Sequence, residues 1–189
     1  MKIERLDIPD VLLLTPQRHG DHRGFFSETY NKRVMADAGI LLNFVQDNHS
    51  QSVAKGTLRG LHFQIPPMAQ HKLVRVVCGS VLDVAVDIRE GSPTFGRYVS
   101  AVISAEAGKQ ILVPVGFAHG FCTLEPNTEL LYKVTDYYSA EHDRGIRWND
   151  TSLAIEWPVG EAEAVLSGKD MELPVLKDLP TYFTYKSGG

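Results

Sequence analysis

The segment 81–89 constrains the fold more than any other part of the sequence. Its even-numbered residues from 82 to 88 are all apolar, whereas Asp83, Asp87 and Arg89 are charged. Side chains along a β-strand point alternately to opposite faces, so this period of two indicates a strand with one apolar face. The chain therefore contains at least one half-buried strand.

Further β-rich segments surround this strand. The segment 72–77 precedes it, and three residues that include Gly79 separate the two, which predicts a β-hairpin with glycine in the turn. Strands are also expected at 98–103, 110–113 and 129–134, with glycine or proline between them. This spacing is typical of an all-β protein.

Helical signals are few. The segment 31–38 predicts one short helix that ends at Gly39, and residues 162–178 are expected to hold one or two helical turns. Many short strands predict one all-β domain over residues 1–189, a sandwich or jelly roll with a few short peripheral helices. The enclosed face of such a fold forms a small-molecule pocket, so inward-pointing polar residues are the candidates for function.

The charge of the chain limits its partners. The formal net charge is −4, which argues against the extended basic surface that a nucleic acid or an anionic membrane requires. The longest apolar run near the N-terminus, residues 11–14, is too short for a membrane span or a secretory signal. Cys78 and Cys122 match no metal spacing, so we expect two buried free thiols and a cytoplasmic protein.

Two glycine–histidine motifs, at 56–64 and 108–119, resemble the two signature motifs of the cupin family, a β jelly roll. Metal-binding cupins carry His-x-His and a glutamate in the first motif and a last histidine in the second. His62 and His119 keep two of these four positions, but Gln64 replaces one histidine and no glutamate follows at the expected distance. A tight metal site needs three or four ligands. We therefore expect no metal, and two histidines that are free for acid–base chemistry.

An ordered series of short blocks extends along nearly the whole chain, from Ile8 to Pro174. In this order the series closely resembles the dTDP-4-dehydrorhamnose 3,5-epimerase family. The resemblance implies a cupin-type jelly roll that forms homodimers and needs no cofactor. The blocks are 21–28, 46–50, 59–64, 72–76, 83–89, 92–96, 114–121, 132–133, 137–139, 145–150 and 167–170.

The resemblance implies a substrate whose chemistry fits these residues. The family acts on a dTDP-linked 4-keto-6-deoxyhexose, in which the C3 and C5 protons are both α to the C4 ketone. Removing such a proton requires a base with a pKa near neutrality and a cation or hydrogen bond at the enolate oxygen. Inversion also requires a proton donor on the opposite face of the ring. The expected product of inversion at both carbons is dTDP-4-dehydro-L-rhamnose.

The resemblance assigns each of these roles to one residue. It makes His62 the base and Asp170 the carboxylate that orients the imidazole. Tyr132 is the acid on the opposite face, and Lys72 is the cation near the C4 oxygen.

The same resemblance implies a set of substrate-binding residues, some of which are expected to come from the partner subunit. Asp143 stands where relatives often have a binding glutamate, so its shorter side chain could shift a hydrogen bond to the nucleotide. The residues expected near the diphosphate and sugar are Arg59, His119 and Lys169, and those expected at the nucleotide are Arg23, Phe26, Glu28, Gln46, Asn48 and the thymine-stacking Tyr138.

Several of these residues also have purely structural explanations. Asp170 could be a helix N-cap, and Lys72 a solvated lysine at a strand edge. Arg23 and Glu28 could form a surface ion pair that contributes little to stability.

Three other functions stay open at this point. A relative of similar sequence could epimerise only one of the two carbons. A metal-dependent cupin would need the ligands that the motifs lack. A non-catalytic jelly roll could bind a nucleotide sugar without turnover.

Overall fold

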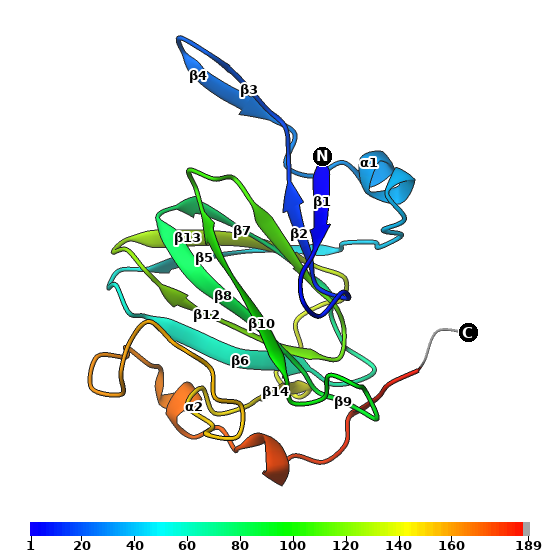
Figure 1. Cartoon of the computed structure of the whole chain (residues 1–189), viewed down its shortest axis with the longest axis vertical. Coiled ribbons are helices and arrows are strands. Elements are labelled where there is room, and N and C mark those ends of the chain that lie inside the picture. Colours follow the sequence, from blue (N-terminus) through cyan, green and yellow to red (C-terminus); the bar gives the residue numbers. More distant parts are fainter. Residues whose placement is uncertain (187–189) are drawn as a thin grey trace.

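The structure, a computed structural model, describes residues 1–186; residues 187–189, the end of the predicted domain, lie outside the described residues. Its main body consists of two antiparallel sheets that face each other (Figure 1). The larger sheet contains, in spatial order, β1 (Lys2–Arg5), β2 (Leu12–Thr15), β11 (Gln110–Val113), β7 (Lys72–Cys78), β13 (Thr128–Val134) and β5 (Gln46–Ser52). The smaller sheet contains β10 (Tyr98–Ser104), β8 (Ser80–Asp87), β12 (Phe117–Thr123), β6 (Leu58–Gln64) and β14 (Asp143–Gly145).

The remaining elements are short and peripheral. Two small sheets pair β3 (Arg18–Asp21) with β4 (Gly24–Ser27), and β9 (Arg89–Glu90) with β15 (Phe183–Thr184). The described helices are α1 (Lys32–Asp37), α2 (Gly168–Met171) and the 3-10 helix η1 (Leu176–Asp178). The predicted all-β jelly roll with a few short peripheral helices is confirmed.

The main core lies between the two sheets. Val74 and Leu130 of the larger sheet pack with Val81 and Ala85 of the smaller sheet in one buried cluster. Burying a side chain of this size removes its apolar surface from water, which stabilises the fold by about 1.5–3 kcal/mol per residue. Val81 and Ala85 of β8 thus form part of the core between the sheets.

The alternating strand has two buried faces. Its even-numbered residues Val84 and Val86 point away from the other sheet and pack beneath the C-terminal segment, against Phe63 and Phe183. Asp83 lies on the opposite, inward face and is fully buried. Because the C-terminal segment covers the outer face, the charged positions of this strand point into the molecule rather than to solvent.

The predicted hairpin at residues 72–89 is wrong. β7 and β8 lie in different sheets, so the chain crosses from one sheet to the other at Gly79. Gly79 has φ +76°, and a Cβ there would clash with Thr128, so the corner requires glycine. A glycine between two strands fits a hairpin turn and a sheet-to-sheet corner equally well.

A hairpin and a short helix follow the N-terminal strands, and short helical turns lie in the C-terminal segment. The β3–β4 hairpin projects away from the two sheets, and α1 lies beside its base (Figure 1). The predicted helix at 31–38 is confirmed as α1, with Asn31 as its N-cap and Gly39 at φ +82° after its end. The C-terminal turns expected within 162–178 are present as α2 and η1.

The cysteines differ from each other. Cys122 is a buried free thiol, as expected, and burial raises its pKa to about 11. The expectation for Cys78 is wrong, because Cys78 lies at the exposed end of β7. Within residues 1–186, no helix has the length and apolar character needed to cross a membrane.

Candidate active site

A cavity of about 220 Å³ lies between the two sheets. The larger sheet contributes one side of it, the smaller sheet the other, and α2 closes one edge. Its lining includes all four predicted catalytic residues. The lining residues are Ser50, Arg59, His62, Lys72, Val74, His119, Phe121, Tyr132, Ser167 and Asp170.

The centre of this cavity is a His–Asp pair. The Nε2 atom of His62 lies 2.5 Å from Oδ1 of Asp170. His62 is partly exposed to the cavity, whereas the Asp170 side chain is only 4% exposed. Strand β6 thus presents the imidazole, and α2 places a buried carboxylate behind it.

The charge state of Asp170 determines the tautomer of His62. Burial raises the pKa of Asp170, but the hydrogen bonds from His62 and Ser167 outweigh this effect and leave the pKa below its ordinary value. An ionised carboxylate can only accept, so Nε2 of His62 donates the hydrogen bond. A neutral imidazole then carries its lone pair on Nδ1, the nitrogen that can accept a proton.

Lys72 supplies a cation at the beginning of β7. Its ammonium donates a hydrogen bond of 3.2 Å to the carbonyl oxygen of His62. Desolvation lowers the pKa of Lys72 to about 8, while the nearby charges of Asp143 and Asp83 oppose that shift. Lys72 is therefore not a solvated edge lysine. It is a desolvated charge next to the dyad, where negative charge on a substrate oxygen would be stabilised most.

Tyr132 lies on the opposite side of the cavity from His62, because β13 belongs to the larger sheet and β6 to the smaller. Desolvation raises the pKa of the Tyr132 phenol, and the charge of Asp143 adds to this effect. The phenol therefore keeps its proton across the neutral range. A proton acceptor and a proton donor thus face each other across one cavity.

A second His–Asp pair lies beside the first. His119 is directly opposite His62 in the β6–β12 register, and its Nε2 lies 2.9 Å from both carboxylate oxygens of Asp83. His119 thus lines the cavity as expected and does not cap a turn. Asp83 was not predicted as a site residue. It alternates with apolar residues in the strand 81–89, and this pattern alone indicates a solvent-facing side chain.

The side chains at the cupin metal-motif positions have protein partners of their own. His62 and His119 both use Nε2 for a carboxylate. Gln64, at the position of the missing cupin histidine, donates to the carbonyl oxygens of Met68 and Tyr137 at 2.6 and 3.0 Å. Within residues 1–186, no group of three or more His, Cys, Asp or Glu side chains is placed to hold a metal ion.

The chain matches a known protein family over most of its length. A family model described as dTDP-4-dehydrorhamnose 3,5-epimerase matches residues 5–178. The chain belongs to this epimerase family. It is therefore an isomerase, as the resemblance implied.

Individual members of the family match over nearly their full lengths. The dTDP-4-dehydrorhamnose 3,5-epimerase of Pseudomonas aeruginosa is 54% identical over 173 residues, which cover 91% of this chain and 94% of that protein. The structure of the Bacillus anthracis enzyme with TDP and PPi bound is 52% identical, with a TM-score of 0.89 over 92% of this chain and 98% of that one. The Legionella pneumophila enzyme in complex with dTDP-4-keto-L-rhamnose is 44% identical, with a TM-score of 0.93 over 98% and 99%.

Among the residues expected to bind the family's substrate, five lie near the catalytic group but make internal contacts. Arg59 lines the cavity and donates to Oγ of Ser52 at 3.2 Å and to the carbonyl oxygen of Gln51 at 3.0 Å. Lys169 forms an ion pair with Asp143, next to Asp170 on α2. On β5, Gln46 donates to Asn48 at 2.8 Å.

Tyr138, the expected stacking residue of the family, lies beyond the end of β13. Its side chain belongs to the exposed large hydrophobic residues, 61% accessible. Its backbone N–H donates to Oε1 of Gln46 at 3.0 Å, which ties this loop to β5. The ring is thus available at the surface and anchored near two other expected nucleotide residues.

The N-terminal residues expected at the nucleotide are not brought to the cavity within one chain. Arg23 and Phe26 lie on the projecting β3–β4 hairpin, and Phe26 is 70% exposed. Arg23 pairs with Asp21 at 2.6 Å, whereas Glu28 accepts a hydrogen bond from Asn31 at 2.7 Å. The alternative of an Arg23–Glu28 ion pair is therefore wrong.

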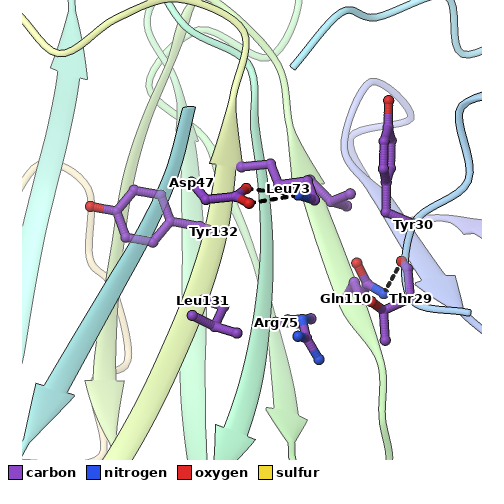
Figure 2. A pocket seen from close by; sticks show the side chains of 9 residues that line it. Thr29, Tyr30, Asp47, Leu73, Arg75, Gln110, Leu131 and Tyr132 are labelled. Carbon is purple, nitrogen blue, oxygen red and sulfur yellow. Dashed lines mark hydrogen bonds and ion pairs between the residues drawn. The ribbon is translucent and has the colours of Figure 1, made fainter. Parts of the chain in front are cut away.

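A second hollow, of about 130 Å³, lies on the outer face of the larger sheet (Figure 2). The side chains of Asp47, Arg75 and Gln110 gather on one side of β13, whereas the Tyr132 ring points away from them (Figure 2). Asp47 forms an ion pair of 2.7 Å with Lys133 there. This hollow contains none of His62, Lys72 or Asp170, so the family's chemistry belongs to the cavity between the sheets.

Proposed function

We propose that this chain inverts both C3 and C5 of dTDP-4-dehydro-6-deoxy-D-glucose and releases dTDP-4-dehydro-L-rhamnose. The observation that carries the proposal is the His62–Asp170 pair, which faces Tyr132 across one cavity and has Lys72 beside it. A ketone with protons on both neighbouring carbons needs these three functions: a base, a donor on the other face and a cation at the oxygen. Membership of the epimerase family supports the same substrate.

The reaction follows from the tautomer of the dyad. Nδ1 of His62 accepts the proton from C3 or C5, and the electron pair of the broken C–H bond moves to the C4 oxygen as an enolate. Asp170 stabilises the imidazolium that forms. Lys72 stabilises the enolate through its charge, which a desolvated site makes stronger.

Tyr132 completes the inversion. The enolate collapses to the ketone as the carbon takes the phenolic proton from the face opposite His62. Before the next step the imidazolium of His62 must release the proton that it took and the phenolate of Tyr132 must recover one, and solvent that reaches the cavity can accept the first and supply the second. The same ketone acidifies both carbons, so one set of groups can act at C3 and at C5 in turn.

The nucleotide site is proposed to be shared between two copies of the chain. The hairpin carries Arg23 and Phe26 away from the chain's own cavity, with an aromatic side chain exposed. An exposed aromatic on a projecting element is typical of a surface that another molecule covers. We infer a homodimer in which the hairpin of one copy reaches the nucleotide of the other.

No metal or organic cofactor takes part in the proposed reaction, and turnover is expected to survive exhaustive treatment with a chelator. Stoichiometric iron, manganese or zinc in the purified protein, with activity lost on chelation, would instead identify a metal-dependent cupin. A cytoplasmic location stays a prediction from the sequence.

Incubation with the keto-sugar in deuterated water tests this function against its alternatives. Each inversion replaces a C–H bond by a bond to solvent hydrogen, so the double epimerase incorporates deuterium at both C3 and C5. Position-resolved NMR of the product gives the answer. Label at one carbon alone indicates the single-carbon epimerase, and its absence from both carbons would indicate a non-catalytic binding protein.

A further inference from the structure

Ser167 lines the cavity and contacts the dyad, yet it has no part in the mechanism described above. It is the N-cap of α2, and its Oγ accepts a hydrogen bond of 3.1 Å from the backbone N–H of Asp170. The same Oγ donates a hydrogen bond of 2.8 Å to Oδ2 of Asp170. One hydroxyl therefore holds both the backbone and the carboxylate of the residue that orients His62.

This arrangement gives each oxygen of the carboxylate one partner. Oδ1 of Asp170 accepts from Nε2 of His62, and Oδ2 accepts from Oγ of Ser167. The carboxylate is almost completely buried, so water has little access to either oxygen. Rotation of the carboxylate about its Cβ–Cγ bond would break both hydrogen bonds in a poorly solvated place and leave buried polar groups unpaired, which is unfavourable.

The turn that carries Ser167 is fixed at both ends. On the N-terminal side, Val165 exchanges backbone hydrogen bonds of 3.0 Å with Gly56 and Leu58 at the beginning of β6. On the C-terminal side, the backbone N–H of Arg147 donates to the carbonyl oxygen of Pro174 at 2.8 Å. The hydroxyl is thus held against the same strand that carries His62.

We propose that Ser167 is a positioning residue of this reaction: its hydroxyl fixes the Asp170 carboxylate so that His62 keeps its Nε2–H tautomer and presents Nδ1 to the substrate. The inference rests on the proposed function, in which His62 is the base. Ser167 acts through Asp170 and transfers no proton itself. Its contribution therefore concerns the rate of proton abstraction and not the affinity for the nucleotide.

Ser167→Ala is expected to lower kcat for deuterium incorporation by about 10- to 100-fold, the factor that one hydrogen bond to a charged group supplies. The KM should change by less than about threefold, because the contact does not involve binding. A rise in KM with an unchanged kcat would mean that Ser167 binds substrate, and would overturn the proposal.

Two further variants separate the hydroxyl from the helix cap. Glycine is nearly as good an N-cap as serine, but it has no donor for the carboxylate. Ser167→Gly should therefore lower kcat as much as Ser167→Ala, while Ser167→Thr, which keeps donor and acceptor, should stay near the wild-type value. Wild-type kcat in Ser167→Gly would show that only capping matters and would defeat the inference.

The pH profile provides a readout that a structural role would not move. The Ser167 hydrogen bond is one of the contacts that lower the pKa of Asp170. Without this hydrogen bond the Asp170 carboxylate is more basic and stabilises the protonated form of His62 more. The acid limb of kcat/KM should therefore move to higher pH. An unmoved limb in both Ser167→Ala and Ser167→Gly would contradict positioning.

A matched control lies in the same C-terminal segment. Oγ of Ser152 donates a hydrogen bond of 2.7 Å to Oδ1 of Asp150, away from the cavity. Ser152→Ala removes an equivalent serine–aspartate contact and should leave kcat and the pH profile unchanged. His62→Ala, measured alongside, separates the two failures. Full activity in His62→Ala would refute the role of His62 as the base. If His62→Ala is inactive but Ser167→Gly has the wild-type kcat, only the role of Ser167 is refuted.

Discussion

Single residues divide the chemistry between the two sides of the cavity. His62 and its carboxylate come from the smaller sheet and α2, while Tyr132 and Lys72 come from the larger sheet. Desolvation acts on Tyr132 and Lys72 in opposite senses. It raises the pKa of the phenol and keeps it protonated, and it lowers the pKa of the ammonium to about 8. Of these two groups, Lys72 is the one whose charge changes closer to physiological pH.

The pH dependence of turnover follows from Lys72. Its ammonium is charged below pH 8 and loses its proton as the pH rises through about 8, so kcat should fall over that range. In Lys72→Arg the guanidinium stays charged, and the falling limb should move to higher pH although kcat at neutral pH is lower. Steady-state rates between pH 6 and 10 measure both effects. A wild-type profile that stays flat to pH 10 would remove Lys72 from the role of enolate cation.

The sequence predicted the roles of individual residues but not the contacts that Asp83 and Ser167 make. The roles of His62, Tyr132 and Lys72 came from the family resemblance, and the chemistry of the ketone is consistent with them; they stay predictions. Asp83 was not predicted, since a charged residue in an alternating strand indicates solvent unless a covering layer is known. The C-terminal segment covers the apolar, even-numbered face of β8, so Asp83 lies on the face that is buried towards the larger sheet.

Among the elements, the β6–β12 pair does most to bring the two histidines together. Their backbones approach so closely at Gly60 that a Cβ there would lie 2.5 Å from Cα of Gly120 and 2.9 Å from the carbonyl oxygen of His119. Gly60 also has φ +131°, which L side chains rarely adopt. Gly60, within the first cupin-like motif, is thus explained by this close approach of β6 and β12.

Gly60→Ala should destabilise the fold by roughly 2–4 kcal/mol, because the added Cβ meets backbone atoms that cannot rotate away and the residue keeps a positive φ. Thermal or urea unfolding measures the change. Gly160→Ala is the control, since a Cβ at Gly160 has no heavy atom within 4 Å. Equal stabilities of the two variants would show that β6 and β12 do not depend on the close approach.

The strand topology was the weakest part of the sequence prediction at this scale. The positions of β7, β10, β11 and β13 agree with the expected segments to within a residue or two. The hairpin between β7 and β8 was wrong, because the turn residues alone do not tell which sheet the next strand joins. That choice depends on which partner strands bury each face, and these partners lie far apart in the sequence.

The whole molecule has a compact sandwich and one projecting hairpin, and the hairpin holds residues that the nucleotide site is expected to need (Figure 1). A site shared between subunits explains why these residues are exposed within one chain. In such a dimer, a substitution in the hairpin impairs the active site of the partner subunit, whereas a substitution in the dyad impairs the subunit's own active site. Symmetric dimers present two such composite sites.

A heterodimer of His62→Ala with Arg23→Ala/Phe26→Ala tests this arrangement. The subunits are coexpressed with different tags and the mixed dimer is purified. If sites are shared, one site contains both defects and the other contains none, so about half of the wild-type activity should return. If each chain uses its own hairpin, both sites carry a defect and the heterodimer stays as inactive as its parents.

The central claim is that Nδ1 of His62 removes the protons next to the ketone. The most direct measurement compares deuterium exchange at C3 and C5 in wild type and His62→Ala, with dTDP affinity measured by calorimetry on the same samples. We predict a fall in exchange of at least about 10²–10⁴-fold, as expected for loss of a general base, with an almost unchanged Kd for dTDP. His49→Ala, an exposed histidine that contacts Glu129, is the control and should exchange normally. Exchange in His62→Ala at rates near those of the wild type would contradict the account.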